Sequence, residues 1–431
     1  MKNSGPRECE HVAMTDRPAP ITSGTDWVYA AIVVAAGLFF GLTNQYHLWT
    51  LDENGFSALS ERLPYWDFTN LWAGSKMALD GNAAILFDAE TYRAALRAML
   101  SPLLPDQEWS YPPSMALVGA PLAQLPIFPA YLVWTFGTIA CLYFALKPLR
   151  LPFVVHIAAA VSPAVLVNTV FGQNGALTGA LLIGGLLIVQ KRPILAGVLF
   201  GLLTIKPHLG ILVPVCLIAS HNWRAFSSAA VTSVLVFLAT GLAFGFDTWP
   251  MFLANTGPLM TAILEAPYPQ PYHANAITVF IGARSIGASL SVAYAAQLAA
   301  ALTAALFVIW LWRPSNPVDH RMRALLTATL AIVATPYGYS YDAIPLCVAV
   351  AFLFVTMPKP PVTFLAFVWL SPLAIHLLHQ QGIGFGILFP ISLCVWMGIR
   401  CLREARSAQS PAAADEATRS ERSQIVAAEL R

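Results

Sequence analysis

The sequence predicts an all-α polytopic membrane protein with roughly 12 transmembrane helices (11–13). A helix that crosses a bilayer needs about 20 mostly apolar residues. The 431 residues are 57% hydrophobic and 11% charged, whereas a soluble domain carries charge on about a quarter of its residues. The apolar residues also come in long runs separated by short polar turns. A soluble fold of this size could not cover so much apolar surface, so we expect one membrane-embedded body.

The apolar runs define the expected spans. These are Trp27–Trp49, Phe128–Leu146, Phe153–Phe171, Ala176–Gln190, Pro193–Ile205, Leu209–Ser220, Ala225–Phe246, Leu290–Trp312, Ala324–Tyr339, Ala343–Met357, Val362–Leu378 and Phe385–Arg400. A further apolar segment, Pro113–Leu125, is interrupted by Pro121 and followed by Pro126. Because proline breaks helices, we expect this segment to be half-inserted or re-entrant rather than to cross.

Basic residues set the expected orientation, since loops that face the cytoplasm are enriched in Lys and Arg. With the N-terminus inside, the basic turns fall on the cytoplasmic side: Lys147, Arg150, Lys191, Arg192, Arg224, Arg313, Arg321, Arg323 and Lys359. The outer face, toward the periplasm or exterior of a cell (inner) membrane, then holds a long loop over residues 50–112 and most of the polar turns. This count works only if Pro113–Leu125 does not cross.

The chain is expected to divide into a cytoplasmic segment over residues 1–26, a membrane body over 27–400 and a solvated, disordered cytoplasmic tail over 401–431. The net charge of +2 is too small to indicate nucleic acid as a partner. The six cysteines form no CxxC pair, and His376 and His379 have no third ligand nearby in sequence. We therefore expect no metal site and no cofactor.

The outer loop over residues 50–112 is expected to carry amphipathic helices that lie in the interface and cover the membrane. Asp67 stands between Trp66 and Phe68 at the expected start of the first of these helices. Apolar neighbours would raise the pKa of such a carboxyl, and a general base needs a pKa of this kind. The alternative is that Asp67 only caps the helix.

Further candidate residues lie at outer turns. Tyr111 precedes two prolines that close the long loop, and Gln173 and Asn174 lie between two glycines where two spans join. Polar side chains at membrane depth need partners or a cavity, so Gln173 and Asn174 would bind a hydroxyl-rich ligand or cap the helix that follows. Tyr111 would line a site or only shape the loop.

Two more outer turns combine charge with aromatic rings. Lys206, with His208 on the same turn, lies between two apolar runs and needs an anion such as a lipid phosphate, or it reaches toward ordinary headgroups. Tyr341 and Asp342 end a tyrosine-rich turn. They would supply an aromatic face and a carboxylate for a sugar ring.

In their order along the chain, these motifs resemble the GT-C-type polytopic glycosyltransferases, and most closely glycosyltransferase family 87, the polyprenol-phosphate-mannose-dependent mannosyltransferases. The resemblance covers roughly residues 27–400. It depends on Asp67-Phe68, Ala73-Gly74, Asp80-Gly81, Tyr111-Pro112-Pro113, Gly172-Gln173-Asn174, Lys206-Pro207 and Tyr341-Asp342.

The resemblance implies an enzyme that moves a hexose, mannose in the named family, from a polyprenyl-phosphate donor to a lipid or glycan acceptor at the outer face, with inversion. It maps the general base onto Asp67 and the donor-phosphate site onto Lys206 and His208. It leaves Gln173, Asn174, Tyr111, Tyr341 and Asp342 for the sugar or acceptor. The chain departs from mycobacterial members at Tyr341-Asp342, where those carry histidine.

Two other classes of function fit parts of the sequence. A transporter or flippase for a lipid-linked or small polar solute would also span the membrane many times, but transporters place their polar residues at mid-membrane in broken helices. A non-catalytic assembly partner is also compatible with the sequence. The chain has no Asp-x-Asp motif, which favours a lipid-phosphate donor over a metal-bound nucleotide sugar.

Overall fold

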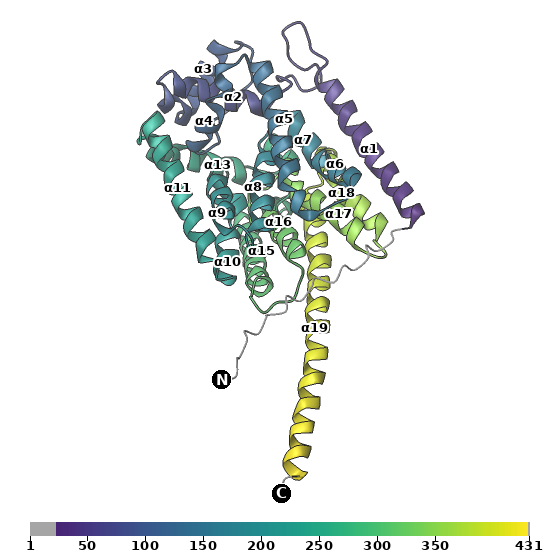
Figure 1. The fold of residues 1–431 in the computed structure, drawn as a ribbon. Helices are drawn as coiled ribbons and strands as arrows, with labels where there is room; N and C mark the ends of the chain where they lie inside the picture. The colour runs from purple at the N-terminus through teal and green to yellow at the C-terminus, as the bar shows by residue number, and fades with distance from the viewer. Residues whose placement is uncertain (1–22, 430–431) are drawn as a thin grey trace.

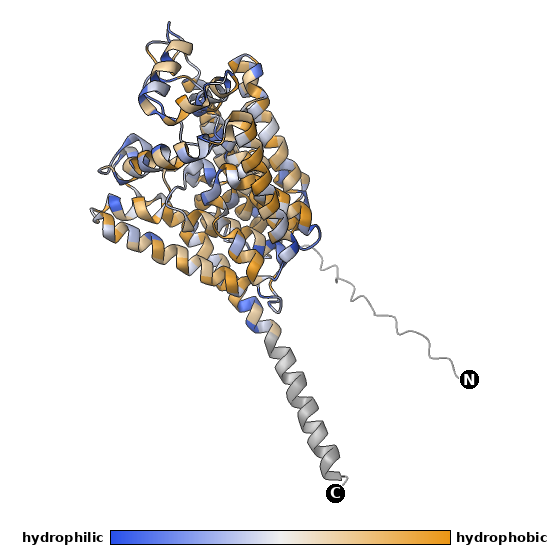
Figure 2. Ribbon diagram, turned by 90° about the vertical axis from the view of Figure 1, so that its left-hand side faces the viewer, coloured by the Kyte–Doolittle hydropathy of each residue, from blue (hydrophilic) through white to orange (hydrophobic). Residues whose placement is uncertain are grey.

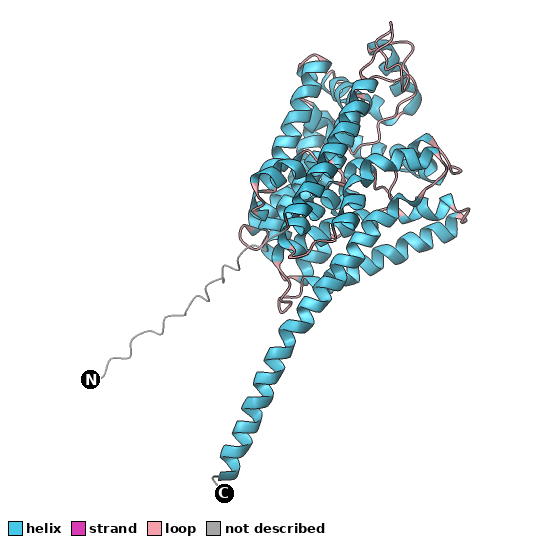
Figure 3. Ribbon diagram, turned by 90° about the vertical axis from the view of Figure 1, so that its right-hand side faces the viewer, coloured by secondary structure: helices cyan, strands magenta, loops and turns pink. Residues whose placement is uncertain are grey.

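Helices form the regular secondary structure of residues 23–429, the part of the chain that the computed structural model describes. Figure 3 shows helices and loops, and the described residues contain isolated β-bridges but no strand. A segment inside lipid must satisfy its backbone hydrogen bonds internally, and a helix does so within itself. The observed class is all-α, as the sequence predicts.

Among the described residues, 7 helices are long and apolar enough to cross a membrane. The elements that form them are α1 (Gly24–Leu48), α5 (Ile127–Ala145), α6 (Phe153–Ala160) with α7 (Pro163–Phe171), α11 (Trp223–Phe244), α15 (Leu290–Leu311), α18 (Val362–Gln380) and α19 (Leu388–Glu429). Shorter helices pack among them: α8 (Gly175–Ile188), α9 (Pro193–Leu202), α10 (Val213–Ala219), α16 (His320–Ala334) and α17 (Ile344–Thr356). Each of the twelve expected spans overlaps one of these elements, except that residues 153–171 form the pair α6 and α7. Seven of the twelve are long enough to cross and five are shorter. The protein is a polytopic membrane protein.

The helices differ in what surrounds them. On α16 every residue from Met322 to Ala334 is buried, and α17 is buried from Ile344 to Phe354. By contrast α1 and α11 expose large apolar side chains such as Phe39 and Leu242. Hydrophobic residues predominate along the long helices, whereas hydrophilic residues gather in loops and at helix ends (Figure 2). The central helices thus form the core, and the outer helices present an apolar surface suited to lipid.

The expected outer loop folds into short helices beside the ends of the bundle helices (Figure 1). They are α2 (Trp66–Leu79), η1 (Ala83–Phe87), α3 (Ala89–Met99), α4 (Ser114–Gly119) and η2 (Leu122–Gln124). α3 is amphipathic, but α2 is more buried than an interfacial helix would be, because its polar residues Thr69, Asn70 and Ser75 are also covered. Short helices replace the expected half-inserted segment, and α4 has only 6 residues.

A second outer segment contains α12 (Thr248–Met251), η6 (Phe252–Thr256), α13 (Gly257–Glu265), η7 (Pro271–Asn275) and α14 (Val279–Ser285). At the C-terminus, α19 continues as a helix through most of the tail for which we expected a disordered extension. The tail is rich in Ala, Glu and Arg, which are strong helix formers. The expected segment over residues 1–26 lies mainly outside the described residues.

The close packing of α2 at Gly74 can be tested by mutation. A Cβ added at Gly74 would lie 2.3 Å from a ring carbon of the buried Trp109. We predict that Gly74→Ala destabilises the protein by about 1–3 kcal/mol, because the overpacked side chain has no room. Gly137→Ala on α5, where nothing lies within 4 Å, is the matched control and should leave the melting temperature unchanged or higher. Equal melting temperatures for the two variants in detergent would contradict this packing.

Candidate active site

The turn between α7 and α8 packs directly on the first turn of α2. Gly172 ends α7 with φ +67, a left-handed conformation that glycine adopts readily. A Cβ at this position would lie 2.5 Å from the Cβ of Phe68. This close approach brings Gln173 to Asp67, where the Gln173 Nε2 donates a hydrogen bond to Asp67 Oδ2 at 2.9 Å. The two residues are separated by 106 positions in the sequence.

Asp67 does not cap α2. The N-cap is Tyr65, no side chain caps this helix end, and Asp67 lies in the first turn with its carboxylate toward Gln173. Burial raises the pKa of Asp67 to about 6, whereas the Gln173 hydrogen bond and the charges of Arg62 and Lys206 lower it. A carboxylate with this pKa is mostly ionised at neutral pH yet accepts a proton readily.

Lys206 finds its anion inside the protein. Its Nζ lies 2.6 Å from Asp342 Oδ1, and both residues are buried, with 7% and 3% of their surfaces exposed. Lys206 joins η4 (Leu203–Ile205) to η5 (Pro207–Gly210), and Asp342 ends η8 (Ser340–Asp342). Burial raises the pKa of Asp342 while the Lys206 charge lowers it. The second oxygen of Asp342, Oδ2, is buried without a hydrogen-bond partner.

Asn174 is a second polar group without a partner. Its side chain is 1% exposed, and neither its Oδ1 nor its Nδ2 has a hydrogen-bond partner. Although Asn174 occupies the N-cap position of α8, its side chain does not cap the helix. The Asn168 Oδ1 instead accepts a hydrogen bond from the Ala176 N–H at 3.2 Å. A buried polar group left unsatisfied costs about 1–3 kcal/mol, so Asn174 is a candidate for contact with a ligand.

The Asn174 and Asp342 turns touch. A Cβ at Gly175 would lie 2.1 Å from the Tyr341 carbonyl oxygen, so the start of α8 packs directly on the backbone of η8. Two unsatisfied groups, an amide and a carboxylate oxygen, therefore come from turns in direct contact. A hydroxyl-rich ligand can donate to the carboxylate and pair with the amide.

Tyrosines surround these groups. The charges of Asp67 and Asp342 both raise the pKa of Tyr111, after the larger effect of its burial, so Tyr111 belongs to the same site and stays neutral. Tyr341 stacks on Tyr339 with ring centroids 5.2 Å apart, and Lys206 Nζ lies 5.1 Å from the centre of the Tyr341 ring. The site thus combines two carboxylates, one lysine and aromatic faces.

His208 is turned toward other neighbours. Its ring centroid lies 5.9 Å from that of Tyr337, and its Nε2 is buried without a hydrogen-bond partner. The structure therefore brings seven of the predicted residues together: Asp67, Gln173, Asn174, Tyr111, Lys206, Tyr341 and Asp342. His208 instead contacts the Tyr337 ring. Among the described residues no group of His, Cys, Asp and Glu could hold a metal ion.

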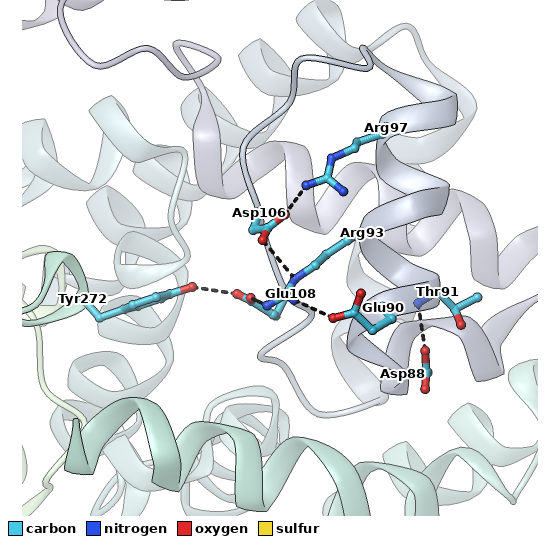
Figure 4. Close-up of polar contacts among 8 residues, drawn as sticks. All are labelled: Asp88, Glu90, Thr91, Arg93, Arg97, Asp106, Glu108 and Tyr272. Carbon is cyan, nitrogen blue, oxygen red and sulfur yellow. Dashed lines mark hydrogen bonds and ion pairs between the residues drawn. The ribbon is translucent and has the colours of Figure 1, made fainter.

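Sequence reasoning missed an ionic network on the outer segments (Figure 4). Glu108 pairs with Arg93 of α3 and accepts a hydrogen bond at 2.7 Å from Tyr272 of η7. Arg93 and Arg97 also pair with Asp106. The network joins the two outer segments. The signal was present as two arginines spaced four apart on α3, which share one helix face, followed nine and eleven residues after Arg97 by two acids.

The segment that carries Glu108 also holds α2. The Asn70 Nδ2 donates to the Glu108 carbonyl oxygen at 2.6 Å, and the Gln107 Nε2 donates to the Trp66 carbonyl oxygen at 2.8 Å. Trp66 is the residue before Asp67. The network and these two hydrogen bonds therefore fix the backbone on which Asp67 stands.

The Lys206–Asp342 pair predicts a pH-dependent stability. We expect Lys206→Met to cost about 3–5 kcal/mol, because it leaves a buried carboxylate unpaired. Without Lys206 the pKa of Asp342 rises further above its unfolded value, and such an acid loses stability as pH rises. The variant should therefore lose more melting temperature in detergent at about pH 8 than at about pH 5. The Lys206→Met/Asp342→Asn double variant should recover most of the loss, and a loss independent of pH would contradict the pairing.

Comparisons with known proteins assign a family to this chain. The model of glycosyltransferase family 87 matches residues 109–336. This range includes Gln173, Asn174 and Lys206, whereas Asp67 and Asp342 lie outside it. Comparisons with curated proteins and with solved structures give no match. Because the match covers more than half of the 431 residues, the family inferred from the sequence motifs is confirmed, and the chain belongs to glycosyltransferase family 87.

Proposed function

We propose that this glycosyltransferase transfers a hexose, specifically mannose, from a polyprenyl-phosphate donor to a hydroxyl group of a lipid or glycan acceptor. The observation that carries the proposal is the contact of Gln173 with Asp67, at 2.9 Å, beside a site with unsatisfied buried polar groups. A raised carboxyl pKa suits a general base, and unsatisfied amide and carboxylate atoms suit sugar hydroxyls. Family membership favours this enzyme over a transporter.

Asp67 is the proposed general base. Gln173 holds one carboxylate oxygen, Oδ2, and within the described residues Oδ1 has no hydrogen-bond partner. Oδ1 is thus available for the acceptor hydroxyl. As the acceptor oxygen forms its bond to the anomeric carbon, its proton passes to Asp67. The bond from that carbon to the phosphate oxygen breaks at the same time, its electron pair stays on the phosphate, and the sugar configuration inverts.

The remaining side chains are proposed to hold the donor. Asn174 and Asp342 Oδ2 would bind sugar hydroxyls. Tyr111 and Tyr341 would line the space around the sugar. Lys206 has donors left after its bond to Asp342. It would therefore stabilise charge that grows on the departing phosphate. The long apolar chain of such a donor requires lipid, which accounts for a membrane body around a sugar-transferring site.

We also place the site at the outer face of the cell (inner) membrane, with both chain termini in the cytoplasm. Support comes from the basic residues at the opposite ends of the spans, such as Lys147 and Lys191. On this arrangement α2, α3 and η7 all lie outside, where a donor carried across the membrane would meet its acceptor.

Replacement of Asp67 tests the base. We predict that Asp67→Asn lowers sugar transfer from polyprenyl-phosphate mannose by about 100- to 10,000-fold, the usual contribution of general acid–base catalysis. Asparagine keeps the size of the side chain and its hydrogen bond from Gln173. The exposed Asp80, at the other end of α2, supplies the control variant Asp80→Asn, which should keep wild-type activity. Equal transfer by both variants would remove Asp67 from this role.

The pKa of Asp67 predicts the acid limb of the pH profile. A base must be deprotonated to work, so the rate at low donor concentration should rise with pH and reach half its plateau near the pKa of about 6. Below that value activity should fall about tenfold per pH unit. A profile that stays flat through this range, with chemistry shown to be rate-limiting, is incompatible with a base of this pKa.

The proposed orientation can be tested by labelling. In a cysteine-free background, Glu90→Cys on the exposed face of α3 should react with a membrane-impermeant maleimide on intact spheroplasts. Lys191→Cys, at the exposed turn between α8 and α9, should react only after permeabilisation. The reverse pattern would place the site in the cytoplasm.

A further inference from the structure

The proposed site lacks positive charge for its substrate. Asp67 and Asp342 contribute two negative charges and Lys206 one positive charge, which leaves a net charge of −1. The donor is itself an anion, because its phosphodiester carries one negative charge. When the sugar leaves, that group becomes a phosphate monoester with about −1.5 to −2 charges near neutral pH. An anion in a water-poor site needs cations beside it, and Lys206, which is already paired with Asp342, cannot alone balance two carboxylates and the donor phosphate.

Arg62 is the other cation near the base. The charges of Arg62 and Lys206 are the two that lower the pKa of Asp67. The Arg62 guanidinium carbon lies 5.0 Å from the centre of the Trp66 ring, and Trp66 directly precedes Asp67. Burial and Glu108 raise the pKa of the Tyr272 hydroxyl, and the charge of Arg62 opposes that rise. The guanidinium therefore lies within electrostatic reach of both the base and η7.

The guanidinium of Arg62 contacts the Trp66 ring but is not held by a carboxylate. Within residues 23–429 it has no ion pair with a carboxylate, whereas Arg93 and Arg97 are both paired. The backbone of Arg62 is fixed, since its carbonyl oxygen accepts a hydrogen bond from the Ser57 N–H at 2.8 Å. Glu61 before it has φ 55, a left-handed conformation that costs free energy in a non-glycine residue. A half-buried, oriented and unpaired arginine fits bidentate binding of phosphate.

We propose that Arg62 binds the phosphate of the prenyl-linked donor, and of the prenyl phosphate that remains after transfer, at the entrance to the Asp67 site. The proposal rests on the proposed function and adds a second cation to Lys206. With Arg62 the site has no net charge before the donor enters. During transfer the electron pair of the breaking sugar–oxygen bond moves onto the phosphate, while the acceptor proton moves to Asp67. Arg62 and Lys206 then both stabilise the charge gained by the phosphate, while Lys206 remains paired with Asp342.

A direct binding measurement tests the role of Arg62 without any need for sugar transfer. Wild type, Arg62→Ala and Arg62→Lys would be placed in nanodiscs of neutral phosphatidylcholine, and binding of labelled undecaprenyl monophosphate would be measured beside that of undecaprenol. Arg62→Ala should weaken monophosphate binding about 10- to 100-fold, the usual effect of a lost hydrogen bond to a charged group. Binding of the alcohol should not change. Arg62→Lys should fall between, because lysine keeps the charge but loses the bidentate geometry.

Arg284→Ala is the matched control, because Arg284 is an arginine of the second outer segment that lies outside the Glu108 network and donates to the Ala288 carbonyl oxygen at 2.8 Å. It should bind undecaprenyl monophosphate as the wild type does. Size-exclusion profiles and melting temperatures of all variants would show that they fold. Equal monophosphate affinity for folded Arg62→Ala and wild type would overturn the proposal.

The source of the phosphate is tested by a second lipid composition. If Arg62 serves bulk lipid headgroups instead, Arg62→Ala should lose only the dependence on added phosphatidylglycerol and keep its preference for the monophosphate over the alcohol. That result would overturn the donor-phosphate assignment.

A wild-type protein that neither prefers the monophosphate nor transfers sugar would refute the proposed function itself. A wild type that prefers the monophosphate, with an unaffected Arg62→Ala variant, would refute only the role of Arg62.

Discussion

The arrangement of the site depends on the buried ion pair between Lys206 and Asp342. The pair bridges 136 residues at 2.6 Å and joins the turn between α9 and α10 to the turn between α16 and α17. Through it the η8 backbone is fixed, and the start of α8 packs on that backbone at Gly175. Gln173, two residues earlier, then reaches Asp67. One ion pair thus sets a series of contacts that ends at Asp67, the proposed base.

The free-energy cost of this arrangement must be offset elsewhere. Asn174 and Asp342 Oδ2 are buried without partners, and each such group costs about 1–3 kcal/mol. The Lys206–Asp342 pair also loses hydration that its mutual attraction only partly restores. The compensation lies in α16 and α17, whose long buried stretches form the centre of the apolar core. A polar ligand that completed the hydrogen bonds of Asn174 and Asp342 would remove this cost.

Local sequence patterns were sufficient for the spans and insufficient for the partners. Long apolar runs and prolines determine where helices cross and break, and those features can be read in a single window of sequence. The partner of Asp67 could not be read in that way, because Gln173 lies 106 residues away. A helix cap was the simplest local interpretation of Asp67. Lys206 was expected to require an anion, but only the fold shows that Asp342 supplies it. Arg62 carries no local signal, since its importance comes from the charges gathered around it.

The outer segments explain how the long loop maintains the raised pKa of Asp67, the proposed base. The raised pKa of Asp67 has its largest cause in burial, so it depends on how well the loop excludes water. Glu108 connects the loop to η7 through Tyr272, while its own backbone is held by Asn70 of α2. Any movement that separates η7 from α3 would therefore also loosen the support of α2, admit water to Asp67 and lower its pKa. The same contacts that position the base thus control its basicity, and a carboxylate exposed by an open loop would be both misplaced and a weaker base.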